Sequence, residues 1–476
     1  MQFISYQFIL LFTIAMIILL KKYKYKKYAL LCFNIVFYLF SGIEGLIVIV
    51  LFGMITFFGA GYLEKHKNRW TTGLIIAISL LPLFMFKYIN FLCHDILGME
   101  QIITFSDIIA PLGISYFTFQ GVGYLIDVYR DKYKSEKSFM DYMIFLSLFT
   151  CISAGPINRA DKMLEQIKRY DYVDFDYERC VEGFRYILLG VMLKVMISTR
   201  MAQVATGTYS HIQDVSGLAL LIASVCFTIQ IFCDFCGYSF MAYGLSKVLG
   251  FEVIQNFNRP YSSKSITEFW RRWHISLSSW LRDYVYFSLG GSRCSKLRTY
   301  FNLMVTFTLS GLWHGAALNY IFWGALNGFL LVIEKVTGLY KVGITRLSRI
   351  LHWAITIILI NITWIFFKVP SVKQGFYVIY KIITDTIRSV YRLSSVDSVL
   401  SLCADMGVTI SDFLCVIVSG LMYLYFELSI CRYDNPTLYF RHNNSLVRWV
   451  KYVVFIVLIF TIGATGNAGD FIYAKF

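Results

Sequence analysis

Long apolar runs alternate with short basic segments along the whole of this chain of 476 residues. The runs lie at about 3–20, 29–42, 43–63, 71–92, 107–129, 139–155, 183–199, 217–249, 299–333, 350–369, 408–429 and 446–466. A backbone surrounded by lipid must satisfy its hydrogen bonds within its own segment, and a helix does so. The pattern therefore predicts an all-α, multi-pass membrane protein with about ten to twelve membrane segments.

Two stretches are predicted to turn back instead of crossing the membrane once. Residues 29–63 are too many for one span of about 20 residues, and Ser41–Gly45 offers a turn between two helices. Basic segments on both sides of residues 139–155 require that run to enter the membrane and return. Gly155 and Pro156 favour such a re-entrant element, so we expect a protein that encloses a cavity.

Composition and charge agree with this interpretation. Hydrophobic residues make up 57% of the chain and charged residues 15%, whereas soluble proteins average about 25% charged residues. The net charge of +15 comes from basic residues between the apolar runs, which indicates positive-inside topology and argues against nucleic-acid binding. The first run precedes its basic cluster, so we expect a membrane span and not a cleaved signal peptide. The clusters expected to face the cytoplasm are Lys21–Lys27, Lys65–Arg69, Arg130–Lys137, Lys162–Arg169, Arg259–Arg298 and Arg432–Lys451.

One ionisable side chain lies within an apolar run. The segment from Thr299 to Ile333 contains no Asp, Glu, Lys or Arg, yet it carries His314 near its middle. At about 1.5 Å per residue such a helix would reach roughly 50 Å, against a hydrocarbon core of about 30 Å. We therefore expect it to tilt or to break near Gly311 and Gly315. A histidine at that depth indicates a functional site, although a packed, hydrogen-bonded histidine is a real alternative.

A second segment, residues 267–284, has the spacing of an amphipathic helix at the cytoplasmic membrane interface. Thr267 is expected to cap it, with Glu268 in the first turn. His274 would then lie at the shoulder of the apolar face. The plainer interpretation is an anchor helix with an incidental histidine. The apolar face is formed by Trp270, Trp273, Leu277, Trp280, Leu281 and Tyr284.

Two histidines, a tryptophan beside each and an arginine-rich rim together favour an active site. A buried, neutral imidazole is a suitable general base near pH 7, and His314 is the candidate. His274 would orient the substrate or stabilise the developing oxyanion. Arginines suit the phosphates of an anionic donor such as coenzyme A, and those near the site are Arg271, Arg272, Arg282, Arg293 and Arg298.

The sequence lacks the motifs of several other classes of enzyme. No serine nucleophile elbow, HExxH motif or phosphate-binding loop is present. The eleven cysteines lack the spacing of a zinc site, so we expect no metal and no bound cofactor. Asp234 is expected to pair with a nearby arginine, and Asn319 and Asn327 to hold the His314 imidazole in one tautomer.

Four blocks carry a family resemblance: PLGISYFTFQGVGYLIDVYR (111–130), AGPINR (154–159), FNRPYSSKSITEFWRRWHISLSSWLRDYVYFSLGGSR (257–293) and SGLWHGAALNYIFWGALNG (310–328). Weaker similarities are WIFFK (364–368) and the terminal FIYAKF. At these residues the chain resembles the membrane-bound O-acyltransferase (MBOAT) family, and within it the bacterial alginate O-acetyltransferase-like branch.

The resemblance implies one membrane domain over residues 1–476, with a histidine-bearing core at about 107–370 and a central tunnel. It maps the invariant family histidine onto His314, and an upstream position that is Asn, Asp or His in other members onto His274. Asn327 stands where alginate-type members often have a further histidine. We expect the donor or substrate to be bound by Trp270, Arg271, Arg272, Trp273, Ser278, Arg282, Trp313 and Asn319.

The implied function is transfer of acetyl groups from acetyl-CoA across the bacterial cytoplasmic membrane. The acceptor would be an exported or cell-wall polysaccharide, or a periplasmic SGNH-type acetyltransferase that passes the group on. Two alternatives stay open. One is D-alanyl transfer to teichoic acid from a carrier-protein thioester. The other, of a different class, is a polysaccharide or acyl exporter that uses the histidines as a proton relay.

Overall fold

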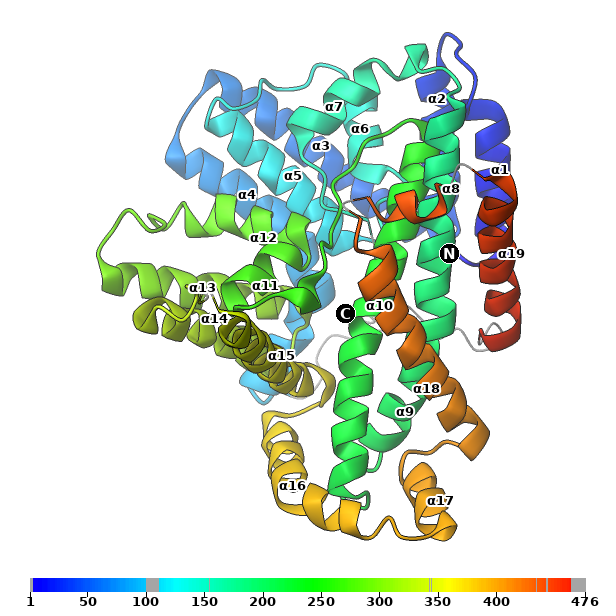
Figure 1. Cartoon of the computed structure of the whole chain (residues 1–476). Coiled ribbons are helices and arrows are strands. Elements are labelled where there is room, and N and C mark those ends of the chain that lie inside the picture. The colour runs from blue at the N-terminus through cyan, green and yellow to red at the C-terminus, as the bar shows by residue number, and fades with distance from the viewer. Residues whose placement is uncertain are drawn as a thin grey trace. The chain divides into compact units, whose positions relative to one another are not determined.

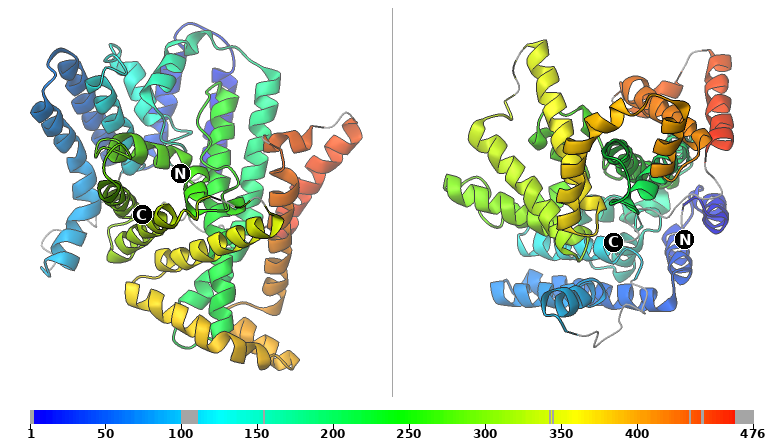
Figure 2. Two further views of the ribbon diagram at one scale, coloured as in Figure 1. Left: turned by 60° about the vertical axis from the view of Figure 1, so that its left-hand side comes forward. Right: turned by 90° about the horizontal axis from the view of Figure 1, so that it is seen from below.

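The computed structural model describes residues 3–99, 111–153, 155–341, 343, 345–433, 435–441 and 444–463. Throughout these residues the regular secondary structure is helical, so the predicted all-α class is confirmed (Figures 1 and 2). The start of the predicted run 107–129 and the terminal FIYAKF lie outside the described residues.

The chain divides into two compact units. The first unit comprises Met1–Ile187, Ser239–Asn256 and Ile275–Ser288. The second unit comprises Leu188–Tyr238, Phe257–His274 and Leu289–Phe476. The expectation of a single domain stays a prediction.

In the first unit, α5 packs against α3, α4 and α6. Gly121 of α5 allows this close approach, because a Cβ atom there would lie 2.5 Å from the ring of Phe52. The ring of Trp280 stacks on Phe119 at 4.0 Å, and its Nε1 donates to the Phe119 carbonyl. The helices of this unit are α1 (Tyr6–Leu19), α2 (Lys26–Leu39), α3 (Ile43–Lys65), α4 (Arg69–Leu83), α5 (Ile114–Tyr129), α6 (Phe139–Ser147), α7 (Ala160–Lys168), most of α8 (Tyr177–Val191), the end of α10 (Gly217–Leu249) and α12 (Ile275–Leu281).

Both predicted reversals lie in this unit. The chain leaves the helical conformation between α2 and α3, where a turn was expected, and Gly42 has a φ of 111°. Helix α6 has nine residues, so at about 1.5 Å per residue it is far too short for a hydrocarbon core of about 30 Å. Residues 139–155 therefore do not cross a membrane as one helix, in agreement with the prediction.

In the second unit, α13 and α14 form a close antiparallel pair, and α15 packs against α14 (Figures 1 and 2). Glycines make the pairing possible. A Cβ atom at Gly311 would lie 2.1 Å from the carbonyl oxygen of Tyr320, and one at Gly324 would lie 2.3 Å from that of Phe307. The helices of this unit are α9 (Thr199–Tyr209), the start of α10, α11 (Ile266–Arg272), α13 (Lys296–His314), α14 (Leu318–Thr337), α15 (Arg346–Lys368), α16 (Val372–Tyr391), α17 (Val396–Asp405), α18 (Ile410–Tyr425) and α19 (Ser445–Ile462).

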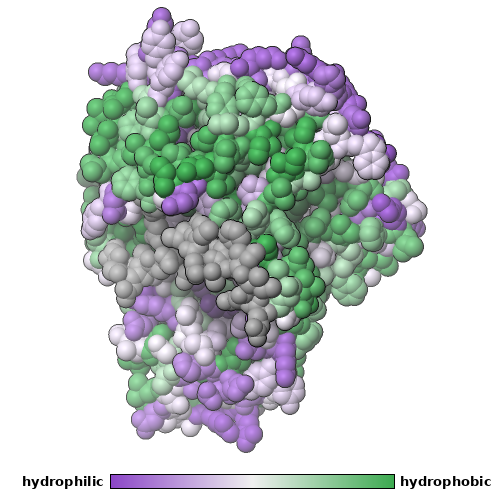
Figure 3. Space-filling model, turned by 180° about the vertical axis from the view of Figure 1, so that it is seen from behind, coloured by the Kyte–Doolittle hydropathy of each residue, from purple (hydrophilic) through white to green (hydrophobic). Residues whose placement is uncertain are grey.

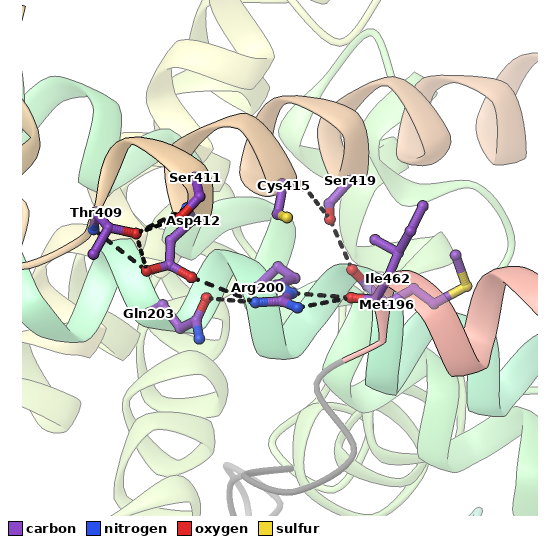
Figure 4. Close-up of polar contacts among 9 residues, drawn as sticks. All are labelled: Met196, Arg200, Gln203, Thr409, Ser411, Asp412, Cys415, Ser419 and Ile462. Atoms are coloured by element: carbon purple, nitrogen blue, oxygen red, sulfur yellow. Dashed lines mark hydrogen bonds and ion pairs between the residues drawn. The ribbon is translucent and has the colours of Figure 1, made fainter.

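Polar side chains hold α9, α18 and the end of α19 together (Figure 4). The guanidinium of Arg200 donates twice to the carbonyl oxygen of Ile462, each time at 3.0 Å, and lies 3.7 Å from Asp412. The hydroxyl of Ser419 donates to the carbonyl oxygen of Met196 at 2.8 Å. The bonds from Arg200 satisfy a carbonyl at the end of α19, which the helix leaves without an internal partner.

A buried ion pair joins α10 to the π-helical segment Met192–Ser198. Asp234 Oδ1 lies 2.5 Å from Lys194 Nζ, and both side chains are almost fully buried. The expectation that Asp234 pairs with an arginine was wrong, because its partner is a lysine. The attraction between the charges offsets part of the cost of removing both from water.

Seven helices among the described residues are long and apolar enough to cross a membrane. Other predicted segments form shorter helices, such as α1, and the predicted run 299–333 is divided between α13 and α14, of which only α14 is among the seven. Hydrophobic residues cover much of the surface seen in Figure 3, as expected for a protein solvated by lipid. These candidate spans are Ile43–Lys65, Arg69–Tyr88, Gly217–Leu249, Leu318–Thr337, Arg346–Lys368, Ile410–Ile430 and Ser445–Ile462.

Candidate active site

His314 is the last residue of α13, at the break predicted for the apolar run 299–333. The backbone becomes extended at Gly315 and turns into α14. Glycine is required there for space, because a Cβ atom would lie 2.2 Å from the ring of Tyr320. The break therefore places the imidazole at a helix end, where its side chain is 2% exposed.

His274 also lies at a break, which corrects the prediction of one helix over residues 267–284. Helix α11 ends at Arg272, α12 begins at Ile275, and His274 adopts a φ of 44°. The backbone N–H of Asn258 donates to the carbonyl oxygen of Arg272, so the end of α11 is bonded to another part of the chain just before this turn. His274 is therefore not on the shoulder of an amphipathic helix. The backbone turn, and not helical periodicity, directs its side chain.

The cap of α11 was also assigned wrongly from the sequence. The hydroxyl of Ser265, not that of Thr267, accepts from the backbone N–H of Glu268. Glu268 does lie in the first turn, as predicted. The side chains of Trp270 and Trp273 are buried within the protein, whereas an interfacial anchor helix would expose them to lipid.

The structure brings the two histidines together. Their ring centroids lie 6.3 Å apart. The His314 ring also packs edge-on against Trp323 of α14, at 5.2 Å, and against Phe367 of α15, at 5.6 Å. Aromatic rings of α14 and α15 thus flank the His314 imidazole at the end of α13.

His274 has its own aromatic neighbours within the second unit. Phe235 of α10 meets its ring edge-on at 4.6 Å, and Trp313 lies at 5.7 Å. We call Phe235, Trp313, Trp323 and Phe367 the aromatic enclosure of the histidine pair. Sequence reasoning singled out only Trp313 of these four. Trp323 lies in the last of the four family blocks and Phe367 in the weaker similarity WIFFK, and these were the signals in the sequence.

Burial controls the charge of His274. The side chain is 1% exposed, and removal from water lowers the pKa of His274 from 6.5 to about 3, because burial disfavours the charged imidazolium. His274 is therefore neutral at physiological pH. A neutral imidazole has one N–H donor and one nitrogen acceptor, so it can donate a hydrogen bond to an oxyanion.

The predicted arginines occupy different environments. Arg271 is exposed, whereas Arg272 pairs with Glu268 at 2.6 Å and donates to the hydroxyl of Ser262. Ser278 and Arg282 belong to the first unit, where Arg282 pairs with Asp283 at 2.8 Å. Donor binding by any of these residues stays a prediction. Arg293 and Arg298 are exposed.

The asparagines bind backbone near the site. Asn319 Nδ2 donates to the carbonyl oxygens of Val369 and Phe366, at the end of α15. Asn327 Nδ2 donates to the carbonyl oxygen of Trp323. Both amides therefore fix the helices that carry the aromatic enclosure. A further role for them in orienting the imidazole stays a prediction.

Glu334, which sequence reasoning missed, connects α14 to α11. Its buried carboxylate accepts from the backbone N–H of Ile266 at 2.5 Å, and from the N–H and hydroxyl of Thr267 at 2.9 and 2.8 Å. These donors belong to the first turn of α11, which lacks partners within the helix. The contact holds the start of the helix that leads to His274. The signal in the sequence was an acidic residue directly after a long apolar run.

Comparisons with known proteins show the family to which the chain is similar. The model of the membrane-bound O-acyltransferase family (MBOAT) matches residues 130–378, which include both histidines. The probable alginate O-acetylase AlgI of Pseudomonas aeruginosa is 36% identical over 365 residues, covering 74% of this chain and 68% of the relative. The peptidoglycan O-acetyltransferase of Helicobacter pylori is 31% identical over 344 residues, covering 66% of this chain and 65% of the relative.

A more distant relative transfers a different group. The teichoic acid D-alanyltransferase of Bacillus subtilis is 30% identical over 301 residues, covering 59% of this chain and 74% of the relative. Together, the apolar helices and these relatives define a membrane enzyme that transfers acyl groups to oxygen. The chain belongs to the membrane-bound O-acyltransferase family.

Proposed function

We propose that the enzyme takes an acetyl group from acetyl-CoA and delivers it to a hydroxyl group outside the bacterial cytoplasmic membrane. The acceptor is an exported or cell-wall polysaccharide, or a periplasmic SGNH-type transferase that acetylates one. The relative from Pseudomonas aeruginosa is named a probable alginate O-acetylase, and the relative from Helicobacter pylori a peptidoglycan O-acetyltransferase. The observation that carries the proposal is the buried pair His274 and His314, 6.3 Å apart.

In the proposed reaction His314 is the general base. Its imidazole takes the proton of the acceptor hydroxyl, and the oxygen attacks the thioester carbonyl carbon. His274 donates a hydrogen bond to the oxyanion of the tetrahedral intermediate. The C–S bond then breaks, and the His314 imidazolium returns its proton to the sulfur. The products are an acetyl ester and free coenzyme A.

The aromatic enclosure supports this chemistry by excluding water. A dry site strengthens the hydrogen bond from His274 to the oxyanion. It also protects the thioester from hydrolysis while the acceptor is absent. The exposed arginines Arg271, Arg293 and Arg298 would supply charge for the phosphates of the donor.

The test compares His314→Ala with His211→Ala, a control in which the replaced histidine is exposed. Both proteins are expressed in cells that lack the native enzyme, and the acetyl content of the cell polysaccharides is measured. We expect His314→Ala to lower the rate of acetylation by about 10²–10⁴-fold, as for loss of a general base. The amount of protein in the membrane should not change. Acetylation retained in His314→Ala would exclude the assigned base.

D-alanyl transfer is the second candidate, favoured by the teichoic acid D-alanyltransferase relative. A donor assay separates the two functions. Purified enzyme is incubated with acetyl-CoA or with D-alanyl carrier-protein thioester, and the free thiol released is measured. Release from acetyl-CoA alone supports the acetyltransferase, and release from the carrier protein alone overturns it.

A further inference from the structure

Helix α16 presents a largely exposed apolar stripe, of which only the first ring, Phe376, contacts rings of α14 and α15 among the described residues. The side chains of the stripe are 50–83% exposed. They recur every three or four residues, so they lie on one face of the helix. The stripe consists of Phe376, Tyr380, Ile383, Ile387, Val390 and Tyr391.

The polar residues of the second half of α16 face the protein instead. Asp385 accepts from the backbone N–H of Gly217 at 2.7 Å and from the hydroxyl of Ser389 at 2.9 Å. Lys381 Nζ donates to the carbonyl oxygen of Gln213 at 2.7 Å. A Cβ atom at Gly217 would lie 2.5 Å from the carbonyl oxygen of Lys381, so α16 packs tightly on the start of α10. These contacts fix the rotation of α16 about its axis.

This orientation is the reverse of the usual one. A helix at the surface of a water-soluble protein turns its apolar stripe to the core and its polar residues to the solvent. Helix α16 turns Asp385 and Ser389 inward and the stripe outward. Its environment must therefore be apolar on the outside.

The neighbouring helices place α16 at the edge of a membrane. In the sequence it lies between α15 and α18, which are both long and apolar enough to span a membrane. Three residues separate Lys368 of α15 from Val372, so the start of α16 lies within about 14 Å of the end of α15. Gly375 packs against the ring of Phe366 and brings the first turn back onto α15.

The charges of α16 fit the same location. Lys373, Arg388 and Arg392 are exposed and lie along one side of the apolar stripe. Tyrosine at the membrane–water boundary and basic side chains near lipid headgroups are typical of interfacial helices. With Lys381 and Asp385 in its middle, α16 is too polar to cross the bilayer and is not among the candidate spans.

We propose that α16 is an interfacial helix whose partner is the lipid bilayer. Its apolar stripe lies at the boundary between headgroups and acyl chains. Lys373, Arg388 and Arg392 reach the headgroups, and Asp385 anchors the helix to α10. This role of α16 does not depend on the acyl-transfer chemistry. A protein partner on the stripe is the competing explanation.

The test measures what surrounds α16 in the full-length protein, purified and reconstituted in lipid nanodiscs. A nitroxide is attached through a genetically encoded ketone amino acid, which leaves the eleven native cysteines unlabelled. Stripe positions Ile383 and Ile387 are compared with Gln374 and Arg388, which are exposed but lie outside the stripe. Collision of the nitroxide is measured with oxygen, which partitions into lipid, and with a nickel chelate, which stays in water.

We expect oxygen collisions to exceed nickel collisions at Ile383 and Ile387, and the reverse at Gln374 and Arg388. Nickel collisions that dominate at the stripe positions would overturn the proposal and favour a protein partner that the purified sample lacks. Low accessibility to both reagents would also overturn it, since the stripe would then pack against protein. Acyl-transfer activity of each labelled protein reports correct folding separately.

Discussion

At the scale of single residues, the backbone explains why a histidine suits position 274. A φ of 44° lies in the left-handed region, which most side chains avoid and which Asn, Asp and His occupy more readily. These are the three residue types that the family resemblance places at this position. The residue at 274 is therefore selected by backbone conformation as well as by chemistry.

Because of this left-handed backbone, we expect two variants without an imidazole to differ in stability. His274→Asn should retain more stability than His274→Ala by about 1 kcal/mol, because Asn tolerates the left-handed conformation and Ala does not. His274→Ala should lose most of the transferase activity, whereas His274→Asn should keep part of it, because its amide can still donate a hydrogen bond. The midpoint of thermal unfolding in detergent, followed by loss of the monodisperse peak, measures the difference. Equal midpoints would show that the backbone conformation imposes no such selection.

At the scale of elements, the site depends on how helices are held at their ends. Helix α11 has seven residues, which is too short to be stable by itself. The carboxylate of Glu334 satisfies donors in its first turn from the neighbouring α14. The position of His274 relative to His314 therefore rests partly on Glu334, a residue that touches neither ring in the contacts described above.

We expect Glu334→Gln to destabilise the protein by about 1–3 kcal/mol, since one amide N–H₂ would face buried N–H donors. The value of kcat should fall with little change in KM for the donor, because the histidine pair loses its alignment. Glu334→Asp, which keeps the charge, should restore part of the rate. The control is Glu268→Gln, whose partially exposed pair with Arg272 contributes little. The positioning role would be contradicted if Glu334→Gln and the control Glu268→Gln changed kcat and KM to the same extent.

At the scale of the whole molecule, two acidic side chains from distant parts of the sequence hold the start of α10. Asp385 of α16 accepts from the backbone N–H of Gly217, and Asp405 of α17 accepts from that of Ser216. Carboxylates at a helix N-terminus interact favourably with its dipole. Helices α16 and α17, which connect the candidate spans α15 and α18, are thereby bound to the start of α10.

The pH dependence of stability should report this contact. The hydrogen bond from Gly217, followed by those from Ser389 and the charges of Arg392 and Lys381, lowers the pKa of Asp385 below 3.8. Its contribution is therefore fully present above about pH 4 and lost as the pH falls through the lower pKa of the folded state.

Asp385→Asn should consequently have a lower thermal midpoint than the wild type at pH 7. Between pH 5 and pH 3 its midpoint should fall less than that of the wild type. Asp397→Asn, at an exposed position of α17, is the control and should follow the wild type. Parallel curves for the wild type and Asp385→Asn over this range would contradict the assignment. Differential scanning fluorimetry in detergent provides the measurement.

Local pattern determined much of this protein. The apolar runs predicted the helices, the turn before α3 and the break at Gly315, because each depends on hydrophobicity and on glycine at nearby positions. The family blocks identified His314 and His274, because those motifs are short and continuous. Periodicity failed at residues 267–284, where the left-handed turn at His274 interrupts the helix.

Only the tertiary structure decided which distant side chains meet. Trp323, Phe367 and Phe235 enclose the histidines because α14, α15 and α10 converge there, and nothing local in their sequences requires it. Glu334 and Asp385 have roles for the same reason, since each satisfies backbone donors of another helix. The sequence also did not predict that the apolar stripe of α16 faces outward. An amphipathic pattern predicts two faces, but packing against Gly217 determines which of them faces the protein.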